Sequence, residues 1–435
     1  MQSEFHLRQL AFGELMRDNS AAIFVAANEQ TRSRDTEYRF RQDSDFYYLT
    51  GFNEPDAWLV LVKKDNQLSR TLFCRPKDAL AEIWHGRRLG AKAAITTLAI
   101  DQAFELSELD EQLVELLNQV DSLYFVLNQH PAAEARVQQT LTRLRQGARQ
   151  GWREPRQIID WRPQLHEMRL FKSVTEIELM RKAADISVAG HIRAMKECRA
   201  GVWEYQLEAG ILHEFAMLGA RDAAYSTIVG GGENACILHY TENESQLVDG
   251  ELVLIDAGAE YAGYAGDITR TFPVNGKFSL EQKAIYQLVL DAQEAALAAL
   301  GPRKSIKQAN DIVLNIMVSG LVELGIMQGE VEQLIEEQAY KAFYMHGLSH
   351  WLGLDVHDVG DYQSVDRSRL LEPGMVITVE PGLYIAASAD VDPKWHGIGV
   401  RIEDDIVITQ QGIDNLTAAA PKSIADIEAL MAQSK

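Results

Sequence analysis

The stretches GELVLIDAG, residues 250–258, and GMVITVEPG, residues 374–382, decide the fold of this chain. They align without a gap: each has a glycine, an apolar run, a carboxylate and, two residues later, a second glycine. Short apolar runs between turn residues are typical of buried strands. Each stretch is followed by another strand-like segment with its own acid, Asp267 in GDITRT and Glu403 in RIEDD. The sequence therefore predicts two equivalent strand pairs related by a pseudo-twofold internal repeat.

Two predicted helices precede each strand pair. Ser173, Ser279 and Ser305 are each followed three residues later by Glu or Gln, the spacing of a capping box at a helix start. The resulting pattern is an α+β domain, with two helices and a strand block occurring twice. The helices are expected from Ser173 to Gly201, over 203–218, from Ser279 to Gly301 and from Ser305 to Gly325, with strands in 222–274 and 375–409.

The N-terminal part has a different sequence pattern, in which apolar strand-like runs alternate with helical segments. This alternation predicts an α/β domain with helices packed on a sheet. We expect domains 1–165 and 166–435, with 151–163 as a solvated connection or, because of its three arginines, a binding surface. The expected strands are 22–27 and 57–62, and the expected helices are 92–103, 107–120 and 132–147.

Composition limits the class of protein. The chain has 435 residues, 46% hydrophobic and 24% charged, which fits two globular domains rather than a disordered chain. Lys and Arg number 42 against 63 Asp and Glu, a net charge of −21. Such a charge repels phosphate backbones, so we expect no nucleic-acid partner.

The cysteines and the N-terminus indicate the compartment. Cys74, Cys198 and Cys236 are widely spaced and form no CxxC pair, which argues against disulfides and thiolate zinc sites. The N-terminal residues lack a signal-peptide pattern, and no apolar run reaches the ~18 residues that a membrane span needs. We expect a cytoplasmic protein without a membrane partner.

The acids of the first strand pair point to a metal. Asp256 ends the apolar run LVLI, where a buried carboxylate is unfavourable unless it is paired or binds a cation. Asp267 follows after a glycine-rich turn, so a hairpin can bring the two acids together. Either one alone would more often be a turn cap or an ion-pair partner. Together they repel each other, and a divalent cation removes that repulsion.

The second strand pair supplies Glu380 and Glu403 in the same relation, with three histidines (His346, His350 and His357) just before them. Four carboxylates and an imidazole form a hard site for two divalent ions, and they suit manganese or cobalt better than structural zinc. Two ions sharing a water molecule would lower its pKa and yield a hydroxide able to hydrolyse an amide.

Other enzyme signatures are missing. His346 and His350 lack the glutamate of HExxH, and Gly230–Gly232 lacks the Lys-Ser/Thr of a P-loop. The glycines are better explained as a tight turn positioning a strand that carries His239. There is no GxSxG nucleophile elbow.

These motifs resemble the creatinase/aminopeptidase metallopeptidases, which have the pita-bread fold, and most closely the bacterial Xaa-Pro aminopeptidases. The shared motifs are DAG at Asp256, GDITRTF at Asp267, HGLSH at 346–350, VEPG at Glu380 and RIED at 401–404. In the N-terminal half, FRQDSDFYYLTGFNEP at 40–55 looks like the signature of that family's N-terminal domain, and EIWHGR at 82–87 like the segment whose tryptophan reaches a neighbouring subunit's active site.

The resemblance implies a role for each matching residue. Asp256 would bind one metal ion, His350 and Glu380 the other, and Asp267 and Glu403 would bridge the two. His239 and His357 would bind the scissile carbonyl or stabilise the tetrahedral intermediate, and Glu380 would relay a proton to the leaving amine. His346 would lie beside the proline, with Arg401 shaping the pocket. Tyr384 and Trp84 would bind substrate. Without the resemblance, Trp84 would be interpreted as an ordinary core or surface aromatic residue.

The resemblance thus implies a metal-dependent exopeptidase, with two divalent ions per subunit, most simply Mn²⁺. It would release the N-terminal residue from peptides with proline second, through a hydroxide shared by the two ions, and assemble as a dimer or tetramer. Three alternatives remain: a prolidase restricted to Xaa-Pro dipeptides, a creatinase-type hydrolase without metal, and an inactive binding module.

Overall fold

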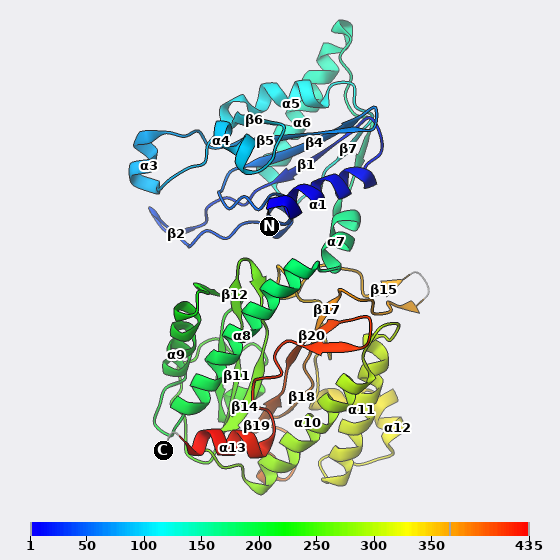
Figure 1. The fold of residues 1–435 in the computed structure, drawn as a ribbon. Helices are drawn as coiled ribbons and strands as arrows, with labels where there is room; N and C mark the ends of the chain where they lie inside the picture. The colour runs from blue at the N-terminus through cyan, green and yellow to red at the C-terminus, as the bar shows by residue number, and fades with distance from the viewer. Residues whose placement is uncertain (1, 365–366, 434–435) are drawn as a thin grey trace. The chain divides into compact units, whose positions relative to one another are not determined.

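The computed structural model describes residues 2–364 and 367–433. The chain forms two compact units, Met1–Met168 and Arg169–Lys435 (Figure 1). Each unit has its own sheet system and apolar core.

The first unit is built on a six-stranded mixed sheet in the order β6-β5-β4-β1-β7-β8. Helices α5 and α6 pack on one face, through apolar residues such as Leu113 and Val137. The strands are β1 (Ser20–Val25), β4 (Trp58–Lys64), β5 (Gln67–Cys74), β6 (Gln102–Glu105), β7 (Ser122–Tyr124) and β8 (Gln157–Ile159), with a separate hairpin of β2 (Thr31–Ser33) and β3 (Thr36–Glu37). The helices are α1 (Gln2–Leu15), α2 (Ser44–Thr50), α3 (Ala79–His85), α4 (Ala91–Thr97), α5 (Leu109–Leu117) and α6 (Pro131–Gln146).

Two predictions for this unit were wrong. The helix expected over 92–103 ends at Thr97, and the edge strand β6 follows it. The segment 151–163 is not a connection, because β8 pairs in parallel with β7 and completes the sheet. The prolines and arginines of this segment are typical of a solvated linker. Its edge strand is only three residues long, which is too short to show a recognisable apolar pattern in the sequence.

The second unit repeats one arrangement, as the aligned stretches predicted. Helices α8 (Val174–Glu197) and α9 (Glu204–Met217) precede the sheet β10-β11-β14, and α10 (Leu280–Ala299) and α11 (Ile306–Glu323) precede the sheet β17-β20-β21. Capping boxes at Ser173, Ser279 and Ser305 start three of these helices. The helices of each pair pack against each other (Figure 1).

Strand register brings the acid-bearing ends together. β11 runs antiparallel to β14, with Asp256 opposite Thr269, and β17 runs antiparallel to β20, with Val379 opposite Asp404. The strands of this unit are β9 (Asp222–Ala223), β10 (Ile228–Gly231), β11 (Leu252–Asp256), β12 (Ala259–Tyr261), β13 (Tyr264–Ala265), β14 (Thr269–Pro273), β15 (Gln363–Ser364), β16 (Arg367–Ser368), β17 (Val376–Val379), β18 (Gly382–Ile385), β19 (Ile398–Arg401), β20 (Asp404–Ile408) and β21 (Ile413–Asn415). The other helices are α7 (Arg162–Leu170), which begins in the first unit, α12 (Val331–Glu336) and α13 (Ile424–Ala432), with 3₁₀ turns at Leu106–Glu108, Gly147–Gln150, Gly232–Cys236, Ala339–Ala342 and Pro393–Trp395.

All three cysteines are free thiols, as predicted. Within residues 2–364 and 367–433, every helix is too short or too polar to span a bilayer.

Candidate metal centre and active site

One pocket of about 480 Å³ in the second unit collects all the predicted metal ligands and all the predicted catalytic residues. Its lining includes Asp256, Asp267, His350, Glu380, Glu403, His239, His346, His357 and Arg401. Tyr384 is buried behind this lining, where its hydroxyl contacts His346 and Arg401. Trp84 is not part of the pocket: it lies on α3 of the first unit with 78% of its surface exposed.

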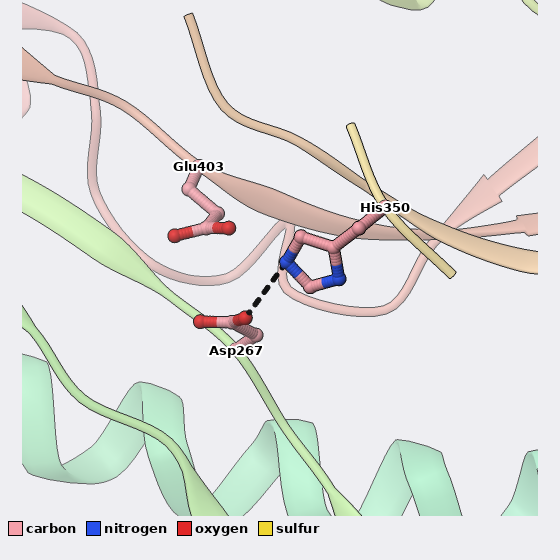
Figure 2. Close-up of side chains that lie close together, drawn as sticks. All are labelled: Asp267, His350 and Glu403. Carbon is pink, nitrogen blue, oxygen red and sulfur yellow. Dashed lines mark ion pairs between the residues drawn. The ribbon is translucent and has the colours of Figure 1, made fainter. Parts of the chain in front are cut away.

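Asp267, His350 and Glu403 lie closest together. One ligand atom from each lies within 4.8 Å of the others, and Figure 2 shows the three side chains pointing toward one another. The Nε2 atom of His350 is 3.4 Å from Asp267 Oδ2, while Nδ1 lies 2.9 Å from the carbonyl of Trp351. Since a carbonyl only accepts hydrogen bonds, Nδ1 carries a proton and Nε2 is presented to the carboxylates, the orientation that a metal-binding imidazole needs.

The other two acids adjoin this group. Glu380 Oε1 lies 3.5 Å from His350 Nε2. Asp256 is held by Arg401, whose NH2 group donates to Oδ2 at 2.6 Å. The hydroxyl of Tyr225 lies 2.6 Å from both Asp256 Oδ1 and Asp267 Oδ1, so its single proton can be donated to only one of them at a time.

The charges of the pocket are unbalanced. Arg401 is the one permanently charged cation among the described residues that line it, against four carboxylates. Burial raises the pKa of Asp267, that of Glu380 to about 7, and that of Glu403 well above its usual value, with repulsion from neighbouring acids adding to the effect. His350 shows the opposite balance: burial lowers its pKa, but Asp267 and Glu380 together outweigh burial and raise it to about 9. Four hard oxygen donors and one imidazole fit two divalent cations, which would remove this repulsion.

Arg401 links the two halves of the pocket. Besides Asp256, it donates through NH1 to the hydroxyl of Tyr384 at 2.9 Å and through Nε to Thr269 Oγ1 at 3.0 Å. Thr269 in turn donates to Glu403 Oε2 at 2.6 Å. The Arg401 guanidinium thus contacts Asp256 of the first strand pair directly and reaches Glu403 of the second through Thr269.

His346 is a neutral acceptor. Burial, with Arg401 nearby, lowers its pKa to about 4. Its Nδ1 donates to the carbonyl of Gly347 at 2.8 Å, so Nε2 accepts from the Tyr384 hydroxyl, also at 2.8 Å.

His239 lies in a turn after the 3₁₀ helix Gly232–Cys236, rather than on the strand that we expected. Gly232 begins this 3₁₀ helix with a φ of +56°, a conformation that favours glycine. Glu204, fully buried at the start of α9, holds the segment from both sides: Oε1 accepts from the Gly231 amide and Oε2 from the Tyr240 hydroxyl, both at 2.8 Å.

His357 is positioned by a buried ion pair. Its ring packs edge-on against His350 at 4.4 Å between centroids. The next residue, Asp358, accepts from Arg169 at 2.5 Å and from Lys172 at 2.8 Å. This ion pair anchors the loop that carries both histidines.

Sequence reasoning missed Tyr225, Thr269, Glu204 and Asp405. Thr269 lies inside a quoted motif, and its position two residues after Asp267 places it on the next strand, where it could have been considered. Asp405, buried two residues after Glu403, accepts from the Asp267 amide at 3.0 Å. Tyr225 and Glu204 have no local motif, because their partners lie 31 or more and 27 or more residues away.

Comparison with known proteins identifies the family. Residues 178–410 match the model of metallopeptidase family M24, and residues 5–124 match the aminopeptidase P N-terminal domain. The chain belongs to metallopeptidase family M24. It is 56% identical to the Xaa-Pro aminopeptidase of Escherichia coli, over 99% of this chain and 98% of that protein.

Solved structures agree over the whole chain. The proline aminopeptidase P II of Yersinia pestis superposes with a TM-score of 0.98 at 59% identity, covering 100% of both chains. A zinc-substituted E. coli aminopeptidase P in complex with product has a TM-score of 0.98 at 55% identity, covering 100% of this chain and 99% of that one. The predicted fold class, family and enzyme class are thereby confirmed: the chain is a metal-dependent exopeptidase of the Xaa-Pro aminopeptidase type, with a pita-bread catalytic domain.

Proposed function

We propose that the pocket removes the N-terminal residue from peptides with proline in the second position, using two divalent ions. The observation that carries this proposal is the convergence of four carboxylates and the Nε2 atom of His350 in one pocket whose described lining residues include a single permanent cation. Asp256 would hold one ion, His350 and Glu380 the other, and Asp267 and Glu403 would bridge them. The oxygen-rich donor set favours Mn²⁺.

When bound, such ions lower the pKa of a shared water molecule and supply hydroxide at neutral pH. The protein's own groups do the rest. His239 and His357 stand at the pocket wall, where they can donate to the scissile carbonyl as negative charge develops on it. Glu380, at the pocket wall beside His350, would pass a proton to the leaving nitrogen.

Selection for proline has a physical basis. The Xaa-Pro bond is a tertiary amide without an N–H group, so a site that makes no hydrogen bond to that nitrogen accepts it. His346 lines the pocket and is backed by the buried Tyr384, with the two rings 5.5 Å apart and their polar atoms already hydrogen-bonded to each other. The carboxylates near the metals would receive the free α-amine.

Three finer points are part of the proposal. Trp84, exposed beside Ile83 on α3, would reach the pocket of another subunit in a dimer or tetramer. The N-terminal domain, for which the sequence predicts residues 1–165, would serve that assembly and substrate access. The free thiols of Cys74, Cys198 and Cys236 suit a reducing cytoplasm.

The test is hydrolysis of Arg-Pro-Pro and Ala-Pro by metal-stripped protein, with and without added Mn²⁺. We expect Mn²⁺-dependent release of arginine from the tripeptide and little cleavage of the dipeptide. The opposite preference would indicate a prolidase. Activity that survives metal removal would indicate a creatinase-type hydrolase, and inactivity with bound metal would contradict the assigned specificity.

A further inference from the structure

His239 and His357, the two histidines proposed to bind the scissile carbonyl, differ from the other histidines of the pocket. Among the described residues, neither of their rings has a hydrogen-bond partner. The rings of His346 and His350 are instead held by hydrogen bonds of their own. A ring that must stay available to the substrate cannot be fixed in this way, so its place depends on the backbone that carries it.

Residues 231–245, which we call the His239 loop, are held by one buried carboxylate. Glu204, at the start of α9 and 0% exposed, accepts hydrogen bonds from four donors of this loop. The donors are the Gly231 amide at 2.8 Å and Asn234 Nδ2 at 3.0 Å on Oε1, and the Tyr240 hydroxyl and the Ser245 amide, both at 2.8 Å, on Oε2. Two carboxylate oxygens accept about four hydrogen bonds in all, so this capacity is fully used. One side chain thus ties together both ends of the loop and the residue next to His239.

The 3₁₀ helix of the His239 loop also lies directly against strand β19. A Cβ atom added at Gly399 of β19 would lie 2.4 Å from the carbonyl oxygen of Ala235, closer than real Cβ contacts come. This close approach of two backbones leaves the 3₁₀ helix no room to shift toward β19. The part of the loop that carries His239 depends on the contacts with Glu204.

We propose that Glu204 is a positioning residue for catalysis, which fixes the ring of His239 by holding the loop that carries it. This rests on the proposed function, which places His239 at the scissile carbonyl. Glu204 is fully buried and is not among the described residues that line the pocket, so it acts through His239 and not on the substrate. A donor lowers the barrier only where charge develops, and a misplacement of about 1 Å can cost about 10²-fold in rate. Loss of Glu204 should therefore lower kcat rather than raise KM.

The experiment measures kcat and KM for Arg-Pro-Pro in the metal-loaded wild type, Glu204→Gln, His239→Ala and the double variant. Glutamine keeps the size of the side chain, but it has one acceptor oxygen and turns an amide group toward two of the donors. We expect Glu204→Gln to lower kcat about tenfold, with KM and metal content unchanged, and His239→Ala to lower it about 10²-fold. The double variant should be no slower than His239→Ala, because no ring is left to position. An equal loss from Glu204→Gln in both backgrounds would overturn the proposal.

Tyr240→Phe is a milder variant that removes one of the four hydrogen bonds and keeps the aromatic ring. It should lower kcat about threefold, and again only when His239 is present. Glu214→Gln is the matched control, because Glu214 lies on the same helix but pairs with Arg193 at 3.2 Å, away from the loop. Its kcat should equal that of the wild type. A Tyr240→Phe enzyme as fast as this control would contradict the inferred role.

Hydrogen–deuterium exchange tests the hold on the loop without relying on activity. In metal-loaded protein, the amides of 231–245 should exchange faster in Glu204→Gln and Tyr240→Phe than in wild type and Glu214→Gln. Unchanged exchange in both variants would show that Glu204 does not hold the loop and would overturn the proposal. Failure of the wild type to cleave Arg-Pro-Pro would instead overturn the proposed function, and with it the catalytic role of Glu204, whereas the exchange result does not depend on cleavage.

Discussion

The two halves of the catalytic unit share an arrangement but differ in how their acids are held. In the first half, Asp256 and Asp267 are short side chains that share the Tyr225 hydroxyl, and Asp256 is paired with Arg401. In the second half, Glu380 and Glu403 have no permanent cation within ion-pair distance among the described residues, and burial raises the pKa of both.

The repeat therefore determines where the acids lie, but not their protonation. Each half also braces the other: Arg401 of the second half holds Asp256, and Thr269 of the first half holds Glu403. This crossing means that neither half forms a working site alone. The following predictions test the crossing.

The largest effect should follow loss of one predicted bridging acid from either half. Asp267→Ala and Glu403→Ala should each lower kcat/KM by about 10³-fold or more and reduce the number of bound metal ions, because both ions lose a ligand. Metal content by elemental analysis and peptide hydrolysis measure this. Exposed Glu242→Ala is the control. Full turnover in either acid variant would contradict the assignment.

Arg401→Lys removes the hydrogen bond from Arg401 of the second half to Asp256 of the first half but keeps the positive charge. A lysine cannot replace the three directed hydrogen bonds to Asp256, Tyr384 and Thr269. We expect kcat/KM to fall about 10²-fold, the usual scale for truncating a buried charge pair, with both metal ions still bound. An unchanged kcat/KM would show that charge alone suffices at this position.

Thr269→Val removes the hydrogen bond from Thr269 of the first half to Glu403 of the second half, with little change in the shape of the side chain. Loss of a hydrogen bond to a metal-binding carboxylate commonly weakens metal affinity 10–100-fold, and we expect about tenfold. Thr269→Ser keeps the hydroxyl and should restore affinity, as measured by competition with a metal-binding dye. Equal affinities for the valine and serine variants would reduce Thr269 to a packing residue.

The last prediction concerns stability rather than catalysis: His191 supports the first half by donating to the carbonyl of Ala257 at 3.0 Å. Burial lowers its pKa from 6.5 to about 4. Between these values the unfolded chain binds a proton that the folded chain excludes, so the free energy of unfolding falls as the pH drops from 6.5 to 4, by about 3 kcal/mol in total. Below pH 4 both states are protonated and this contribution stays constant.

His191→Gln should flatten this part of the pH dependence in metal-loaded protein, measured by urea unfolding, whereas exposed His213→Gln should leave it intact. An identical pH slope in wild type and His191→Gln would show that other groups cause the acid sensitivity.

Local patterns carried much of the fold prediction. The capping boxes at Ser173, Ser279 and Ser305 determine where three helices start, because the cap is a contact between residues three apart. The acids at the ends of β11 and β17 stand out because a carboxylate closing an apolar strand is unfavourable without a partner. The short strand β8, in contrast, has no apolar pattern of its own and exists only because β7 offers it a pairing edge.

By itself, the sequence determined the family, the set of five candidate ligands and the repeat, since these depend on residue types at fixed local spacing. Only the tertiary structure decided which groups hold the ligands. Tyr225 reaches Asp267 across 42 residues, Thr269 reaches Glu403 across 134, and Arg401 reaches Asp256 across 145. Such contacts arise from the register of strands and the packing of distant segments, which no local pattern encodes.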